Sequence, residues 1–212
     1  SGSGKSTLAN ILSGVIESDE GEVVFEGTIV SGNNLTSKKN GIQIVFQDPF
    51  SSINERFTVE EVISEPLKIL KEDSPKEIKG KVKKSLEEVQ LPNDEMFLSR
   101  KCFSLSGGQR QRLSLARSLV MKPKLLIADE ITSMLDPSTK ANIVRLLKGL
   151  QNKNGFSMLY ITHDLLVARK IADRVYVMQN GKIVEQGIAY EVFSNPEDDY
   201  TKKLVEGIEN LF

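Results

Sequence analysis

Hydrophobic residues recur along this chain with two different periods, and the period predicts whether a stretch forms a strand or a helix. Short stretches that alternate apolar and polar residues, or that are wholly apolar, indicate strands. Longer stretches with apolar residues on one face indicate helices. The predicted strands span 21–27, 41–46, 125–128, 156–161, 175–178 and 182–185. The predicted helical stretches span 7–13, 58–91, 107–121, 137–150, 165–172 and 200–208.

Some element boundaries carry local sequence signals. Ser74-Pro75-Lys76-Glu77 has the pattern of a capping box with proline at the first helical position. Pro137 stands in the first turn of another predicted helix, and Asn180-Gly181 is typical of a two-residue hairpin turn. These signals predict the start of two helices and a hairpin between the last two strands.

The order of the elements predicts an α/β fold. Strands and helices alternate at both ends of the chain, and a wholly apolar strand such as 125–128 is typical of a parallel sheet. We therefore expect a single domain over 1–212, with a mainly parallel sheet and an inserted helical subdomain. The α/β core is expected over about 1–48 and 119–190, the helical subdomain over about 49–118 and a C-terminal tail over about 191–212.

The overall composition narrows the possible functions. The 212 residues are 39% hydrophobic and 27% charged, and 28 Lys and Arg against 29 Asp and Glu give a net charge of −1. A nucleic-acid partner is not expected, because such proteins carry a basic surface. Cys102 is the only cysteine, so no intrachain disulfide can form. No apolar run approaches the roughly 20 residues of a membrane helix, so a membrane role would depend on a partner.

The first seven residues have the pattern of a phosphate-binding loop. Glycines let the backbone curl so that N–H groups point inward, and the following helix adds its positive end. Lys5 is expected to reach the β- and γ-phosphates, and Ser6 to bind Mg²⁺. Alone, this loop predicts only that a nucleoside triphosphate binds. The predicted nucleotide-binding residues are Ser1, Gly2, Ser3, Gly4, Lys5, Ser6 and Thr7.

This loop begins at the first residue of the chain. The usual pattern starts with a further glycine and follows a strand, and both would precede Ser1. We therefore expect a chain that is truncated at its N-terminus.

A second motif, Lys124-Leu-Leu-Ile-Ala-Asp129-Glu130, joins an apolar strand to two acids. The carboxyl ends of parallel strands form the edge at which α/β proteins bind ligands. Asp129 is therefore expected in the shell of the magnesium ion, and Glu130 is expected to polarise the attacking water. The alternative is an acid that only caps the following helix. The adjacent Asp-Glu pair favours the catalytic interpretation.

A third motif provides a second candidate anion site. In Leu105-Ser106-Gly107-Gly108-Gln109-Arg110-Gln111-Arg112, Ser106 can cap a predicted helix and the two glycines leave N–H groups open. The alternative interpretation is simply a well-capped helix. The octet resembles the signature motif of the ATP-binding cassette (ABC) family. Its predicted nucleotide-binding residues are Ser106, Gly107, Gly108 and Gln109.

Three shorter segments extend this resemblance over the chain. Gln47 in Val-Phe-Gln-Asp-Pro is similar to the Q-loop of the family, Ser133-Met134-Leu135-Asp136 to its D-loop, and His163 to its switch histidine. The resemblance implies a phosphate-loop NTPase in which two domains pack head to tail. Each ATP would lie between the phosphate loop of one domain and the 106–109 segment of the other.

The same resemblance implies roles for individual residues. ATP and Mg²⁺ would be the cofactors, and one partner would be a second ABC ATPase, either identical or different. Ile131 and Met134 stand where many members have proline and alanine, and neither supplies a catalytic group. The implied catalytic residues are Glu130, His163 and Gln47, the metal-binding residues are Ser6, Gln47 and Asp129, and the dimer contact is Asp136.

Three further segments resemble one branch of the family, the importers of oligopeptides, dipeptides and nickel. They span 46–54, 57–67 and 195–204, although Asp198 and Asp199 replace the more usual His-Pro. The branch implies a subunit that powers solute import through transmembrane permease subunits, with an external solute-binding protein. It also implies a peripheral place on the cytoplasmic face of the cell membrane. The alternative is a non-transport ABC ATPase of the assembly, translation or DNA-repair type.

Phe50, Ile53 and Phe57 lie near the Q-loop segment. We expect these residues to line a groove that accepts a short helix from the membrane subunit. The alternative is that they pack into the core of the helical subdomain.

Overall fold

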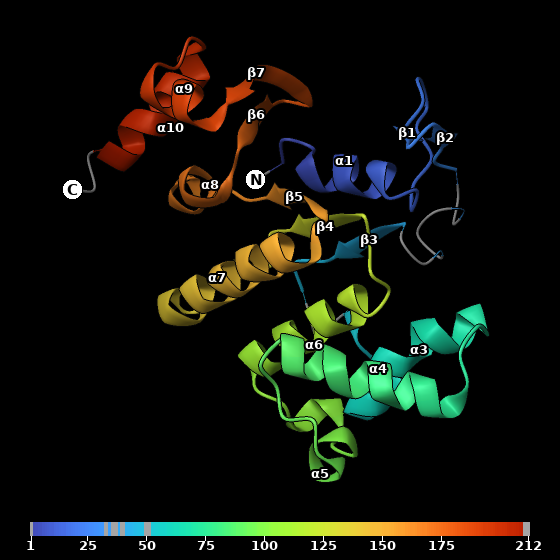
Figure 1. The fold of residues 1–212 in the computed structure, drawn as a ribbon. Coiled ribbons are helices and arrows are strands. Elements are labelled where there is room, and N and C mark those ends of the chain that lie inside the picture. Colours follow the sequence, from blue (N-terminus) through green and yellow to red (C-terminus); the bar gives the residue numbers. More distant parts are fainter. Residues whose placement is uncertain (1, 32–33, 35–37, 39–40, 49–51, 210–212) are drawn as a thin grey trace.

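The structure is a computed structural model, and it describes residues 2–31, 34, 38, 41–48 and 52–209. A parallel sheet lies at its centre, with helices on both faces (Figure 1). Helix α1 (Lys5–Leu12) covers one face, and α6 (Gly107–Leu119) and α7 (Pro137–Asn154) cover the other. A parallel sheet that is covered by helices on both faces confirms the predicted α/β fold.

The central sheet has three parallel strands in the order β3, β4, β5. Strand β4 (Leu125–Asp129) pairs with β3 (Ile42–Val45) on one side and with β5 (Ser157–Ile161) on the other. In this register Asp129 lies opposite Ile161, the last residue of β5. The strands therefore end at a common edge, and the residues that follow them lie close together.

Both faces of this sheet are buried, which explains why the sequence of β4 is almost wholly apolar. Leu126 and Ala128 belong to a large hydrophobic core that includes residues of α6 and α7. Ile127, which points to the opposite face, belongs to a smaller core with Ala9 of α1. This alternation is expected of a strand that is covered on both sides.

A group of helices lies beyond α6, farther from the sheet (Figure 1). Both long helices of the group begin with a capping box, and in α4 Ser74 and Glu77 form it as predicted. Lys71 has a left-handed φ of 55° and ends α3, so the predicted helical stretch 58–91 is two helices. The group consists of α3 (Val59–Leu70), α4 (Pro75–Glu88), α5 (Glu95–Leu98) and the 3-10 turn Cys102–Ser104.

The helix group and the sheet share one hydrophobic core. Leu67 of α3, Leu86 of α4 and Leu115 of α6 are buried in the same cluster as Leu126 of β4. Such continuous burial supplies most of the stability of a domain of this size. The division of the chain into an α/β core and a helical subdomain stays a prediction, because this cluster spans both parts.

A short hairpin follows α1. Strands β1 (Val24–Phe25) and β2 (Thr28–Ile29) are antiparallel, and Glu26 and Gly27 form the turn with φ angles of 49° and 75°. The strand predicted over 21–27 is therefore present as β1, but it is shorter than predicted. The last two residues of the stretch form a turn with two positive φ angles, since such turns match the twist of the paired strands.

A longer hairpin lies near the C-terminus. Strands β6 (Arg174–Gln179) and β7 (Lys182–Ile188) are joined by Asn180 and Gly181, whose φ angles of 49° and 77° confirm the predicted turn. Three helices pack around it: α8 (Leu165–Ile171), α9 (Ala189–Ser194) and α10 (Asp199–Glu209).

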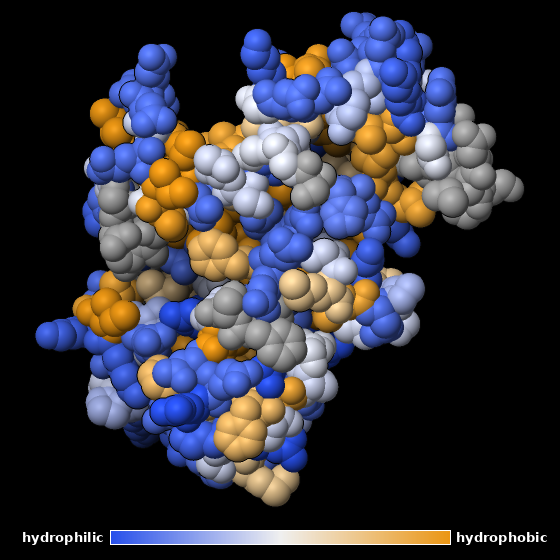
Figure 2. Space-filling view, turned by 180° about the vertical axis from the view of Figure 1, so that it is seen from behind, coloured by the Kyte–Doolittle hydropathy of each residue, from blue (hydrophilic) through white to orange (hydrophobic). Residues whose placement is uncertain are grey.

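The surface carries no broad hydrophobic belt on the side seen in Figure 2, where hydrophobic residues form separate small groups. Within the described ranges, no helix combines the length and the apolar character needed to cross a membrane. The most exposed large hydrophobic side chains include Met96, Phe103 and Tyr190, which belong to three different elements.

Candidate functional site

The phosphate loop leads directly into α1, and its glycines adopt conformations that other residues avoid. Gly2 and Gly4 have left-handed φ angles of 85° and 87°. Gly4 is the N-cap of α1, and its carbonyl oxygen accepts a 2.9 Å hydrogen bond from the Leu8 N–H. A Cβ atom at Gly4 would lie 3.3 Å from Met178 Cε, so the backbone angle and the limited space both favour glycine. Ser1, which was predicted in this loop, lies outside the described residues.

Hydrogen bonds hold this loop against the β6–β7 turn. The Gly181 N–H donates to the Ser3 carbonyl oxygen at 3.1 Å, and Lys5 Nζ donates to Ser3 Oγ at 3.0 Å. The first turn of α1 contains no acidic residue, so the N–H groups at its start carry an uncompensated positive potential. Lys5 and these N–H groups are the groups at this end of the site that could bind an anion.

Asp129 ends β4 and is buried, with 5% of its surface exposed. Burial raises the pKa of its carboxyl group, and the neighbouring Glu130 charge raises this pKa further, whereas the Ser6 hydroxyl and the Lys5 charge lower it. Its Oδ1 has no hydrogen-bond partner among the described residues. A buried, unpartnered carboxylate oxygen is costly unless another group completes the site.

Glu130 follows Asp129 and faces the histidine beyond the next strand. His163 Nδ1 lies 3.2 Å from Glu130 Oε2, and the Glu130 N–H donates to the Ile161 carbonyl oxygen at 2.9 Å. Glu130 has a left-handed φ of 47°, which is uncommon for a residue other than glycine. Two of the residues that the resemblance implies as catalytic therefore lie together in the structure.

Gln47 follows β3 and contacts the segment that was compared with the D-loop. Its Nε2 donates to Ser133 Oγ at 3.2 Å, across 86 residues of sequence. Gln47, Glu130 and His163 thus lie just beyond the ends of three neighbouring strands. The sequence analysis did not identify Ser133 as the partner of Gln47, and no local signal could have shown it.

The 106–109 segment begins α6 and forms a capping box. The Gln109 N–H donates to Ser106 Oγ at 3.3 Å, and the Ser106 N–H donates to Gln109 Oε1 at 3.0 Å. A Cβ atom at Gly108 would lie 3.2 Å from Thr139 Cγ2, so the start of α6 lies beside the start of α7. No hydrogen bond or ion pair between described residues joins this segment to the phosphate loop.

The buried side chain of Arg110 anchors the start of α6 through polar contacts. Its side chain is 8% exposed, and it contacts the Glu55 carboxylate at 2.5 Å. It also donates to the carbonyl oxygens of Phe103 at 3.0 Å and Leu105 at 3.3 Å. These bonds attach the capped segment to the chain that follows Gln47, so the two parts of the candidate site are mechanically linked.

Asp136, the expected dimer contact, is the N-cap of α7. Its carboxylate accepts hydrogen bonds from the N–H groups of Ser138 at 3.1 Å and Thr139 at 3.0 Å. The side chains and N–H groups of Thr139 and Ser138 hold the pKa of this exposed carboxyl far below its ordinary value. Asp-Pro at a helix start is a capping signal that the sequence analysis missed. A contact with a second subunit stays a prediction.

The predicted groove is only partly present. Ile53 is 5% exposed and belongs to the large core, so it cannot line an open groove, and its inclusion was wrong. Phe50 lies outside the described residues. Phe57 lines a cavity of about 500 Å³ together with Glu61, Glu65, Lys68, Ile69 and Lys71.

The arrangement at the sheet edge defines a class of protein. A glycine-rich loop before a helix, a lysine in that loop and two acids after the central strand form the site of a phosphate-loop nucleoside triphosphatase. The profile of the family described as ABC transporter matches residues 1–133. The chain belongs to this family, as the octet at 105–112 predicted.

One relative is an oligopeptide transport protein, the kind of protein that the predicted branch contains. The chain is 41% identical over 213 residues to the oligopeptide transport ATP-binding protein OppF of Haemophilus influenzae. The alignment covers 98% of this chain and 63% of that protein. The chain therefore spans less than two thirds of the length of this relative.

Two solved structures have a similar fold. One is cbiO1 of Clostridium perfringens, part of the ABC transporter complex cbiONQ, with a TM-score of 0.77 and 31% identity over 92% of this chain and 76% of cbiO1. The other is the ATP-binding cassette MJ0796, a dimer in a post-hydrolysis state bound to ADP and phosphate. Its TM-score is 0.75 at 30% identity, over 88% of this chain and 81% of MJ0796.

Replacing Asp129 with asparagine is expected to raise the unfolding temperature of the nucleotide-free protein near pH 7 and to remove ATP turnover. Burial raises the pKa of the folded carboxyl above its ordinary value of 3.8, so ionisation at neutral pH weakens the fold. Below that ordinary pKa both states are protonated and the penalty is absent. The stability gain of Asp129→Asn should therefore be largest near neutral pH and shrink on acidification, as measured by thermal circular dichroism. An unchanged or lower unfolding temperature near pH 7 would contradict this account.

Proposed function

We propose that this chain is the ATP-binding and ATP-hydrolysing subunit of an importer of oligopeptides. The observation that carries the proposal is the convergence of Lys5, Asp129, Glu130 and His163 at one edge of the parallel sheet, with Glu130 and His163 3.2 Å apart. A phosphate-binding end next to a carboxylate–histidine pair suits transfer of a phosphoryl group to water.

Each residue at this edge has a separate task in the proposed reaction. Lys5 and the loop N–H groups bind the phosphates of ATP and offset their negative charge. Glu130 accepts a hydrogen bond from the attacking water and polarises it, a role typically worth about 10²–10⁴ in rate. His163 holds the Glu130 carboxylate and the γ-phosphate in place. Gln47 links the site to the helix group through its contact with Ser133.

Ser6 and Asp129 are the residues that fit a magnesium ion. Their side chains are close enough for the Ser6 hydroxyl to lower the Asp129 pKa, and Asp129 Oδ1 has no partner among the described residues. Hydroxyl and carboxylate oxygens are ligands that Mg²⁺ prefers, and the Gln47 side-chain oxygen is a third candidate. When bound, the ion supplies positive charge beside the phosphates.

The catalytic unit is proposed to be a head-to-tail dimer, either of two copies or with a related chain. The 106–109 segment offers N–H groups to an anion but makes no contact with its own phosphate loop in the described part of the chain. A second subunit would bring its own segment to the ATP held by this loop. The dimeric state in which MJ0796 was solved supports this arrangement.

Similarity to the oligopeptide transport protein of Haemophilus influenzae supports the proposed cargo and membrane partners. We propose that two transmembrane permease subunits and an external solute-binding protein complete the transporter. The chain would then lie on the cytoplasmic face of the membrane and attach to it only through the permease. Deleting the gene should abolish uptake of a labelled tripeptide, and re-expression should restore it. Normal uptake without the gene would refute the peptide assignment.

Truncating Phe57 to alanine is expected to reduce peptide uptake at least about tenfold while the purified subunit keeps its ATPase rate. Phe57 lines the 500 Å³ cavity on α3, and a buried aromatic anchor can contribute more than 1 kcal/mol to an interface. Uptake by cells and phosphate release by the purified subunit measure the two effects. Phe103→Ala, which removes an exposed phenylalanine of the same helix group, is the matched control. Equal loss in both variants, or an unfolded Phe57→Ala protein, would remove support for this surface.

A further inference from the structure

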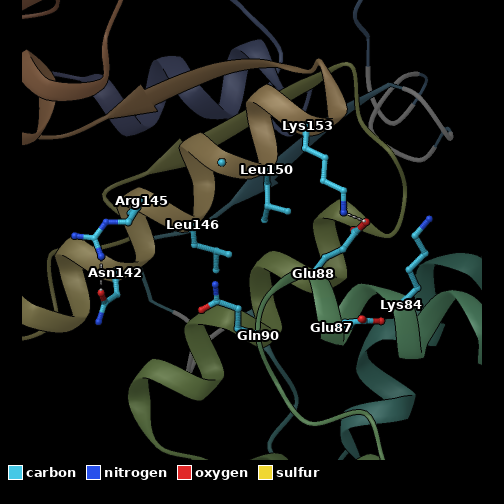
Figure 3. Close-up of a pocket in the computed structure, with 10 residues that line it drawn as sticks. Lys84, Glu87, Glu88, Gln90, Asn142, Arg145, Leu146, Leu150 and Lys153 are labelled. Carbon is cyan, nitrogen blue, oxygen red and sulfur yellow. Dashed lines mark hydrogen bonds and ion pairs between the residues drawn. The ribbon is translucent and has the colours of Figure 1, made fainter.

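A second cavity, of about 600 Å³, lies between α4 and α7, on the side of the sheet opposite to α1 (Figures 1 and 3). Helix α4 contributes Lys84, Glu87 and Glu88 to its walls, and α7 contributes Arg145 and Lys153. The two helices meet here directly, because Lys153 of α7 forms an ion pair with Glu88 of α4 at 3.6 Å. The cavity is unrelated to the phosphate loop, and none of the roles described above uses it.

One end of this cavity is rich in hydrogen-bond donors. Arg145 donates to Asn142 Oδ1 at 3.3 Å, and its other N–H groups make no bond with the described residues. Arg112 donates to Gln90 Oε1 at 3.4 Å, which leaves the Gln90 amide nitrogen directed toward Leu146 (Figure 3). A guanidinium with further N–H groups to donate, beside an amide N–H₂, suits a carboxylate.

The other end carries an unpaired negative charge. The Glu87 carboxylate forms no hydrogen bond or ion pair with any described residue, whereas the neighbouring Glu88 is engaged by Lys153. Lys84 stands one turn earlier on α4, and its ammonium group is directed away from Glu87 in Figure 3. Glu87 is therefore available to a positively charged ligand group.

The floor between these two ends is apolar. Leu146 and Leu150 are 9% and 5% exposed and belong to the large core, so they form a fixed surface. Gly149 lies between them, and no atom would come within 4 Å of a Cβ atom there. The absence of a side chain at this position leaves room above the floor for small apolar groups.

We propose that this cavity binds a short peptide in its zwitterionic form. Its C-terminal carboxylate would bind Arg145 and the Gln90 amide, and its N-terminal ammonium would bind Glu87. Small side chains of the peptide would lie over Leu146 and Leu150. The volume of about 600 Å³ is within the range of about 300–1,000 Å³ that is usual for small-ligand sites.

Such a ligand would connect two parts of the ATPase. Helix α4 packs against α6, whose N-cap is Ser106. The N-cap of α7 is Asp136, which follows Glu130 closely in the chain. A peptide bound to both helices would restrain their relative movement and slow ATP turnover. This regulatory effect rests on the proposed function, since it makes the imported product an inhibitor. The binding itself does not depend on that function.

The test is a titration of the purified protein with trialanine in the absence of nucleotide, in which calorimetry or NMR detects binding. We expect saturable binding that Arg145→Ala and Glu87→Gln each weaken at least about tenfold, as the loss of a charge-assisted hydrogen bond does. Arg169→Ala and Glu206→Gln change exposed residues of α8 and α10 and should leave the affinity unchanged. Trialanine should also slow ATP turnover in the wild type more than in Arg145→Ala.

Several outcomes would overturn the proposal. They are the absence of saturable binding, equal affinity of Arg145→Ala and the wild type, and equally tight binding of trialanine with both ends blocked. Displacement of trialanine by an equal concentration of acetate would show an anion site only, which also overturns it. A protein that binds trialanine but hydrolyses no ATP would refute the proposed function and leave the peptide site intact. A protein that hydrolyses ATP without binding trialanine would refute the peptide site and leave the proposed function intact.

Discussion

The Glu130→Gln variant is expected to bind ATP normally and to hydrolyse it about 10²–10⁴ times more slowly than the wild type. Glutamine keeps the size of the side chain but cannot accept a proton from the water. His163 Nδ1 can still donate to the amide oxygen across the present 3.2 Å, so the geometry should persist. ATP should therefore hold two subunits together, and the variant should accumulate as a nucleotide-bound dimer.

Two measurements check this result. Phosphate release reports the rate, and light scattering after gel filtration with ATP reports the dimer. Glu191→Gln, which changes an exposed acid of α9, is the matched control and should keep the wild-type rate. A Glu130→Gln protein that still turns over at full rate would remove Glu130 from its catalytic role. Slow turnover without a dimer would leave that role intact and refute the shared site.

The Lys5→Ala variant is expected to lose roughly 10–100-fold in affinity for ATP. Hydrogen bonds to charged groups contribute about 1.5–3 kcal/mol, and removing the ammonium also removes positive charge beside the phosphates. In the free protein the Lys5 ammonium donates a hydrogen bond only to Ser3 Oγ among the described residues, so alanine should not disturb the fold. The loss should therefore appear in nucleotide binding and leave the unfolding temperature unchanged.

Titration with a non-hydrolysable ATP analogue measures this affinity directly. Lys203→Ala removes an exposed lysine of α10 and is the matched control. If Lys5→Ala bound the analogue as tightly as the control, the phosphate-loop assignment would be untenable. Weak binding combined with a lowered unfolding temperature would point instead to damage of the loop.

Features that depend on residues close together in the chain were predictable. The capping box at Ser74, the turn at Asn180-Gly181 and the cap at Ser106 all follow from side chains that bond their own backbone a few residues away. The strand predicted over 21–27 is present, but only Val24 and Phe25 form it. Alternation with flanking glycines does not show where such a strand ends, because its extent is set by pairing with β2.

Features that depend on packing were less predictable. The hydrophobic period of the 58–91 stretch does not show that α3 ends at Lys71. Helices α5 and α9 are too short to show a helical period. Ile53 was expected to be exposed, but it is buried against residues from distant elements. The burial of Ile53 depends on which distant residues pack around it, and the residues next to it in the sequence do not specify them.

The sequence by itself determined the chemistry of the site: the lysine of the phosphate loop, the Asp129-Glu130 pair, the 106–109 segment and a single histidine. These are local patterns, because each motif must bend or cap its own stretch of backbone. Only the tertiary structure decided which of them meet. The register of three parallel strands brings Gln47 to Ser133 and Glu130 to His163, whereas it leaves the 106–109 segment apart from its own loop. The cavity between α4 and α7 has the same origin, since its charges come from helices that become neighbours only when both pack on one core.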